Sequence, residues 1–222
     1  MNQPKAHMSF TKQAAYEELR YRIITQQLAP GELLKDKDLM ERYGIGRTPL
    51  REVFLELQNE GLIKRVPRAG TWVAPMDFHF LKQVTEIRIG LEGIAGELAA
   101  ERISEQQLAE LDSILETVKA HEADPKTNFE ELLKYESAFH NVIYASTGNP
   151  QLEKLLRNYQ SVGARFWHSL VFSREQMAEQ FRSHRLMLAA LKKRDKKTCK
   201  EITEEHIRNY AGMINDRIGP ES

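Results

Sequence analysis

Apolar residues in the first third of the chain recur at the three- and four-residue spacing of amphipathic helices. The third stretch is the clearest, with apolar side chains at i, i+3, i+4 and i+7: Leu50, Val53, Phe54 and Leu57. Proline or glycine interrupts the pattern near residues 30, 44 and 61. In chain order the pattern predicts three helices and two strands: residues 10–28, 36–43, 47–60, 62–66 and 71–74. Helix, helix, tight turn, helix and hairpin is the order of a winged helix-turn-helix.

From residue 77 onward the spacing is helical throughout. It predicts six helices joined by short loops: residues 77–102, 104–121, a third ending near 146, 151–171, a fifth beginning near 173, and 195–217. Ser104 with Gln107 and Ser173 with Gln176 have the spacing of capping boxes. Short loops favour an antiparallel bundle. We therefore predict a mainly α protein, with a winged helix-turn-helix at residues 8–75 and an all-helical antiparallel bundle at residues 77–218.

Composition limits the classes of protein that the chain can belong to. It has 222 residues, 41% of them hydrophobic and 29% charged, which is enough apolar material for one large or two modest cores. No window is apolar enough to span a membrane, and the first residues lack the apolar centre of a secretory signal. The single cysteine, Cys199, excludes an internal disulfide framework. These features indicate a cytoplasmic protein with no membrane partner.

The zero net charge hides a difference between the two parts. Residues 1–75 hold 12 Lys and Arg against 9 Asp and Glu, so the remainder holds 20 against 23. Residues 42–70 contain six basic residues and three acidic ones. A small basic segment on an acidic body suggests parts with different partners.

The helix after the tight turn carries candidates for contacts with double-stranded DNA. Arg47 and Arg51 are four residues apart, so they share the face opposite the apolar stripe, and Thr48 lies beside them. An arginine can donate to two acceptors of a guanine at once. Two arginines at this spacing are usually a solvated helix face, but the order of turn, basic helix and basic hairpin favours DNA contact.

Other positions offer contacts with the DNA backbone. Arg68 and Gly70 are at the hairpin tip, where a positive charge and a small residue suit close approach to phosphate. Lys37 is either a phosphate contact or an ordinary surface lysine. Lys64 and Arg65 are as consistent with a solvated strand as with contact.

The helical part carries residue types that bind transition metals. Glu136 and His140 are four residues apart, so both project from one helix face, and antiparallel packing could bring His184 and His206 to them. Three imidazoles and a carboxylate suit Zn, Ni, Mn or Fe. A Glu-x-x-x-His pair also occurs often by chance, and spacing alone cannot join distant histidines.

Residues 10–75 resemble the DNA-binding domain of the GntR family of bacterial transcriptional regulators. The resemblance rests on residues 30–34, 39–43, the run Gly44-Ile45-Gly46-Arg47-Thr48-Pro49-Leu50-Arg51-Glu52, and residues 60–71. Gly46 departs from the Ser or Thr that the family usually has as a helix cap, so a hydroxyl contact to phosphate would be lost.

Residues 77–217 resemble the FCD effector domain of the FadR-type subfamily. The matching segments are Glu136-x-x-Phe139-His140 through residue 150, His184-Arg185 with residues 188–191, and His206. The resemblance implies one divalent transition metal per subunit, with zinc as the first candidate, held by Glu136, His140, His184 and His206. Asp is more common at the first position, so Glu136 extends the ligand by one methylene.

The same resemblance implies a small-molecule effector. Arg88 fits the Glu-x-Arg pattern at the start of such domains and could pair with a carboxylate ligand, or else form an intramolecular ion pair with Glu92. Asn149 and Arg165 are further candidates for contact with the effector.

These features predict a homodimeric transcriptional repressor whose affinity for operator DNA is controlled by a small carboxylate bound at the metal. A metal-dependent hydrolase or lyase fused to a DNA-binding domain is the alternative, because three histidines and a carboxylate also describe catalytic centres. No motif places a catalytic base beside the metal, so we expect no enzymatic activity. A purely structural metal is the third possibility.

Overall fold

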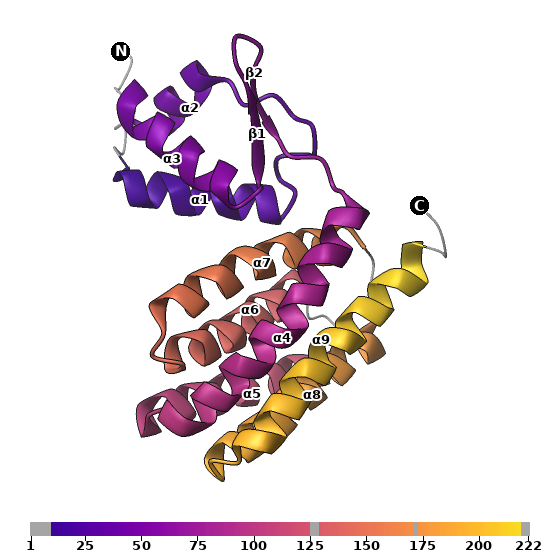
Figure 1. The fold of residues 1–222 in the computed structure, drawn as a ribbon. Helices are drawn as coiled ribbons and strands as arrows, with labels where there is room; N and C mark the ends of the chain where they lie inside the picture. Colours follow the sequence, from indigo (N-terminus) through magenta and orange to yellow (C-terminus); the bar gives the residue numbers. More distant parts are fainter. Residues whose placement is uncertain (1–9, 125–128, 171–172, 219–222) are drawn as a thin grey trace. The chain divides into compact units, whose positions relative to one another are not determined.

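The computed structural model describes residues 10–124, 129–170 and 173–218 (Figure 1). Within these ranges the chain forms two compact units, one made of residues 10–77 together with 164–169, and the other of the rest of the described residues. None of the helices in the described ranges combines the length and apolar content that a bilayer crossing requires.

The first unit contains three helices and a hairpin: α1 Lys12–Ile24, α2 Asp36–Tyr43, α3 Arg47–Asn59, β1 Ile63–Val66 and β2 Gly70–Val73. The strands pair antiparallel, with Ile63 opposite Val73 and Val66 opposite Gly70. The apolar stripe of α3 is buried in a core shared with α1 and α2. Fold and element order are those that the sequence predicts.

The first helix is shorter than expected. It ends at Ile24 instead of residue 28, because Gln26 adopts the left-handed conformation, with φ of 59°, and no helix continues through it. The chain then packs Leu28 back into the core.

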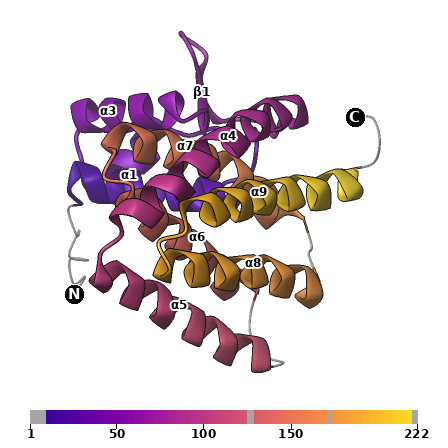
Figure 2. The ribbon, with the colours of Figure 1, turned by 60° about the horizontal axis from the view of Figure 1, so that its bottom comes forward.

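The second unit contains the remaining helices: α4 Phe78–Arg102, α5 Glu105–Ala123, α6 Phe129–Ser146, α7 Pro150–Ser169, of which the last residues belong to the first unit, α8 Arg174–Lys192 and α9 Lys196–Ile218. α4 packs along α9, α9 also contacts α8, and α5 lies against α6 and α8 (Figure 2). Both predicted capping boxes are present, at Ser104 and Ser173. Residue 171, the expected end of the fourth bundle helix, lies outside the described residues.

Close contact between α4 and α9 depends on glycine. A Cβ added to Gly96 would lie 2.9 Å from the carbonyl oxygen of Cys199 and 2.5 Å from Oγ1 of Thr203. Only glycine allows this backbone separation. Gly93, one turn earlier on α4, lies equally close to the Glu204 side chain of α9.

Candidate metal centre and nucleic-acid interface

Four side chains from three helices meet inside the second unit. Glu136 and His140 come from α6, His184 from α8 and His206 from α9. Each offers a ligand atom, and these atoms all lie within 4.8 Å of one another. The four residues that the sequence and the family resemblance select are therefore brought together by the bundle.

The cluster is almost completely shielded from solvent. The three histidines are at most 2% exposed, and the Glu136 side chain is 14% exposed. Nε2 of His140 lies 3.1 Å from Oε1 of Glu136 and 3.2 Å from Nε2 of His206. Phe139 stacks on the His184 ring, with a centroid distance of 4.3 Å. Such packing restrains the rings before any ligand binds.

Several of these nitrogens have no hydrogen-bond partner among the described residues. They are both ring nitrogens of His184 and Nδ1 of His206. Burial without a partner is costly for a polar atom. A ligand at this point would remove that cost.

The histidines differ in their electrostatic surroundings. Burial, together with the neighbouring imidazoles, lowers the pKa of His184 and of His206 well below the usual range. Burial also acts to lower the pKa of His140, but the Glu136 carboxylate outweighs it and the net shift is upward. His184 and His206 are therefore neutral, which is the protonation state that binds a metal ion.

The donor set fits a divalent transition metal. Tetrahedral ligands at about 2.1 Å from one ion are about 3.4 Å apart, so the four atoms, which lie within 4.8 Å of one another, need to close by up to about 1.4 Å. Three imidazoles and one carboxylate leave coordination positions for water or another ligand. Zinc, nickel, manganese and iron(II) all accept this set.

Arg88 forms an intramolecular ion pair with Glu92, which was the predicted alternative to pairing with a carboxylate effector. Its Nη2 lies 2.8 Å from Oε1 of Glu92, one turn along α4, and both residues are buried. Tyr144 also donates to Oε1 of Glu92, at 2.6 Å. Burial acts to lower the pKa of Arg88, but Glu92 outweighs it and the net shift is upward. The sequence analysis named Glu92 only as a partner for Arg88 and did not name Tyr144, although each is one helical turn from a predicted site residue.

The other two effector candidates have different surroundings. Asn149 is exposed, and its Oδ1 accepts from the backbone nitrogens of Gln151 and Leu152 at 3.2 Å, which caps the start of α7. Arg165 donates to the carbonyl oxygen of Ala74 within the first unit, and burial lowers its pKa to about 10. None of these hydrogen bonds involves a residue of the cluster, and effector contact by Asn149 or Arg165 stays a prediction.

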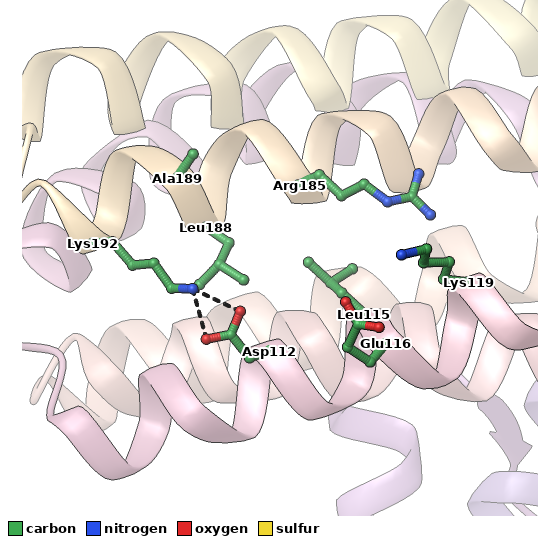
Figure 3. Close-up of a pocket in the computed structure, with 8 residues that line it drawn as sticks. All are labelled: Asp112, Leu115, Glu116, Lys119, Arg185, Leu188, Ala189 and Lys192. Atoms are coloured by element: carbon green, nitrogen blue, oxygen red, sulfur yellow. Dashed lines mark hydrogen bonds and ion pairs between the residues drawn. The ribbon is translucent and has the colours of Figure 1, made fainter.

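A separate groove lies between α5 and α8 (Figure 3). Its lining mixes both charges, and Lys192 pairs with Asp112 across it at 2.7 Å. Arg185 follows His184 in sequence, but its side chain faces this groove and pairs with Glu122. The groove contains none of the four cluster residues.

The predicted contacts with DNA lie on the surface of the first unit. Arg47, Thr48 and Arg51 are exposed on α3, opposite its buried stripe. Gly46 precedes the helix and makes no side-chain cap. Lys37 is exposed in the first turn of α2. These positions are available to a partner.

The candidate residues of the hairpin differ in their exposure and packing. Arg68 is exposed at the turn, with φ of 63°. Gly70 has φ of 142°, and a Cβ there would lie 3.1 Å from Cδ1 of Leu33, so this glycine has a packing role of its own. Lys64 is exposed, whereas the Arg65 guanidinium lies 5.6 Å from the centre of the Phe54 ring.

Both units match known protein families. Residues 11–73 match the bacterial regulatory proteins of the gntR family, and residues 83–209 match the FCD domain family. The chain is 29% identical to the HTH-type transcriptional regulator McbR of Escherichia coli K12, over 94% of each sequence. It is 28% identical to the HTH-type transcriptional repressor GlaR of the same strain, over 90% of this chain and 94% of that protein.

Two solved structures have the same fold as this chain. Escherichia coli McbR/YncC superimposes with a TM-score of 0.81 at 25% identity, covering 94% of this chain and 98% of that one. A GntR regulator from Rhodococcus sp. RHA1 shares the fold, with a TM-score of 0.71 at 16% identity, covering 92% and 97%. The relatives are named as regulators, which does not favour the hydrolase or lyase alternative. The chain belongs to the GntR family of bacterial transcriptional regulators and carries an FCD domain.

Proposed function

We propose that this protein is a cytoplasmic repressor whose affinity for operator DNA is controlled by a small carboxylate bound at a metal ion in the helical domain. The observation that carries the proposal is the buried cluster of Glu136, His140, His184 and His206, with three ring nitrogens that lack partners among the described residues. The cluster lies in the helical unit, whereas the exposed arginines of α3 belong to the first unit. Sensing and DNA binding are thus assigned to different units.

Charge balance supports an anionic effector. Around the cluster, Arg88 contributes one positive charge, and Glu92 and Glu136 contribute one negative charge each. Arg185, the residue after His184, pairs with Glu122, so this pair adds no net charge. A divalent cation with neutral histidines would leave one net positive charge in a buried site, which is unfavourable without a counterion. One carboxylate group from an effector would neutralise it.

The proposed effector acts by favouring one arrangement of the helical domains. Two recognition helices of a homodimer must match two half-sites, so a change in their spacing changes the fit to DNA. Release of DNA on effector binding is the direction we propose. One recognition helix makes few base contacts, and pairing of two protomers supplies the rest.

A face of α4 is our candidate for the dimer contact. Phe80, Ile87 and Ile94 are 42%, 49% and 46% exposed and follow one another at seven-residue intervals. Seven residues are close to two helical turns, so the three side chains share one face. A second copy of this chain would bury that face.

DNA binding is tested by titrating a labelled duplex, selected from a random library with the wild-type protein, in fluorescence anisotropy. We expect Arg47→Ala and Arg51→Ala each to weaken binding by about 1 to 3 kcal/mol, because each removes contacts to base edges. Lys37→Ala would instead weaken binding to all duplexes and reduce the salt dependence.

Arg182→Ala is the matched control, because Arg182 is an exposed arginine of α8 in the other unit, with 70% of its side chain accessible. We expect it to bind DNA like the wild type. Unchanged affinity in both α3 variants would overturn the assignment of the recognition helix.

A further inference from the structure

We propose that Glu92 is a positioning residue for the metal centre, whose carboxylate accepts the Nδ1 hydrogen of His140 and thereby keeps Nε2 of that ring free to bind the metal. This inference rests on the metal centre of the proposed function. It adds a residue of α4 to a site whose ligands come from α6, α8 and α9.

The two nitrogens of His140 face different groups. Nε2 faces the other ligands, at 3.1 Å from Oε1 of Glu136 and 3.2 Å from Nε2 of His206. Nδ1 faces the opposite way, at 3.9 Å from Oε2 of Glu92. Only Nε2 is therefore placed to bind the metal, and the neutral ring must carry its hydrogen on Nδ1 to do so.

Glu92 is held firmly enough to impose that tautomer. Its Oε1 accepts from Nη2 of Arg88 at 2.8 Å and from the hydroxyl of Tyr144 at 2.6 Å. The residue has no exposed surface, and Arg88 and Tyr144 are also buried. Tyr144 is four residues after His140 on α6, so this helix carries both the metal ligand and the hydroxyl that holds Glu92 in place.

The second carboxylate oxygen of Glu92 is turned toward His140. Oε2 of Glu92 is buried and has no hydrogen-bond partner among the described residues, and the nearby donor that it faces is Nδ1 of His140. A shift of about 1 Å would bring the pair into hydrogen-bond range. An ion pair that served only to join two turns of α4 would not need an oxygen aimed at the metal ligand. Carboxylates that orient a metal-binding histidine in this way also raise its basicity.

Glu92→Gln tests the proposal with a side chain of the same size. The amide oxygen can still accept from Arg88 and Tyr144, but the amide NH₂ then faces Nδ1 and donates to it. This favours the tautomer with hydrogen on Nε2, in which the nitrogen that faces the other ligands cannot bind the metal. We expect zinc affinity, measured on the full chain by competition with a chromophoric chelator, to fall roughly 10- to 100-fold.

The matched control is Glu97→Gln, which removes an exposed carboxylate from the same helix. We expect it to bind zinc like the wild type. Because Glu92→Gln leaves the Arg88 charge unbalanced, the double variant Arg88→Gln with Glu92→Gln is measured as well, and it should also bind zinc weakly. Tyr144→Phe removes one donor to Glu92, does not change the charge, and should weaken zinc binding by a smaller factor. If the Glu92 variants do not fold, Tyr144→Phe decides the question.

Nitrogen chemical shifts of labelled histidine provide a readout that a merely structural role would not move. In the zinc-loaded wild type, where the metal occupies Nε2, Nδ1 of His140, assigned by the loss of its signal in His140→Gln, should have the shift of a nitrogen whose hydrogen is donated to a carboxylate, and in Glu92→Gln it should not. Wild-type zinc affinity and an unchanged Nδ1 shift in zinc-loaded Glu92→Gln would overturn this inference alone. Absence of zinc binding by the wild type would overturn the metal centre on which it rests.

Discussion

The His184 ring is packed by aromatic neighbours while its nitrogens are left without hydrogen-bond partners among the described residues. Phe139 stacks on its ring at 4.3 Å and Phe181 approaches edge-on at 5.5 Å, so the ring plane is fixed by apolar contacts. Both of its nitrogens lack partners among the described residues. A neutral imidazole that is held in place and has a nitrogen without a hydrogen-bond partner is suited to bind a metal ion without further rearrangement.

Loss of one ligand should remove most of the bound metal. We expect His184→Ala and His206→Ala each to retain only a small part of the wild-type metal content after dialysis, measured by elemental analysis, because each removes direct coordination from a four-residue site. Both variants should still bind DNA, since the recognition helix belongs to the other unit, but they should no longer respond to a panel of lactate, malonate, succinate and citrate.

His79→Ala is the control, because His79 is exposed near the start of α4 and pairs with Gln83 at 3.0 Å. Its metal content should equal that of the wild type. Metal loss in the ligand variants together with an intact response to the carboxylates would reduce the metal to a structural role.

Residue spacing accounts for only part of the site. Glu136 and His140 could be paired from the sequence because one helix fixes their relation. His184 and His206 could be added only through the family resemblance, because their distance from α6 depends on helix packing. Glu92 was recognised as a partner for Arg88, but its orientation toward His140 depends on how α4 and α6 meet, which spacing along one helix does not contain.

Helix ends and helix contacts differ in how far the sequence determines them. The capping boxes at Ser104 and Ser173 are formed as predicted, because both partners of each box lie within four residues. The predicted end of α1 at residue 28 was wrong, because the chain turns at Gln26 in the left-handed conformation and no proline or glycine there indicates the turn. The close packing of α4 on α9 was not predicted, because Gly96 gains its role only from a neighbour about a hundred residues away.

That contact can be tested by adding one methyl group. Gly96→Ala should lower the free energy of unfolding by about 1 to 3 kcal/mol, because the new Cβ would meet the backbone carbonyl of Cys199 and force the helices apart. Urea denaturation followed by circular dichroism measures the change.

Gly90→Ala, on the same helix, is the control. A Cβ there meets nothing within 4 Å, so the substitution should stabilise the protein by roughly 0.5 to 1 kcal/mol through helix propensity. Equal effects of the two substitutions would contradict the close packing of α4 and α9.

At the scale of the whole molecule, the proposed dimer depends on the α4 face of Phe80, Ile87 and Ile94. Ile87→Glu and Ile94→Glu should shift the full-length protein from dimer to monomer at micromolar concentration, because each places a charge in the face that a second copy would bury. Sedimentation velocity distinguishes the two states.

Leu186→Glu provides a matched comparison, since Leu186 is an apolar residue of α8 with a similar exposure of 53%. This variant should remain dimeric. A monomeric wild type would contradict the dimer, and dissociation by Leu186→Glu alone would move the contact to α8.

The division into two units explains how one chain can join DNA binding to ligand sensing. The basic, exposed face of α3 and the buried cluster of the bundle belong to different compact units, so DNA binding and ligand sensing use separate sets of residues. The sequence indicated this division through its charge asymmetry and the change from mixed to purely helical spacing near residue 77. The identity of the effector depends on cavity shape and coordination geometry, which neither signal contains.

Native mass spectrometry of the freshly isolated full-length protein tests the central claim most directly, because it reports subunit number, metal and retained ligand in one spectrum. The account predicts a dimer that carries two transition-metal ions, which are lost on treatment with a strong chelator and are absent from the His184→Ala protein. A wild-type protein whose mass equals that of its bare chains, or one that keeps its metal when His184 is replaced, would contradict the proposed metal centre.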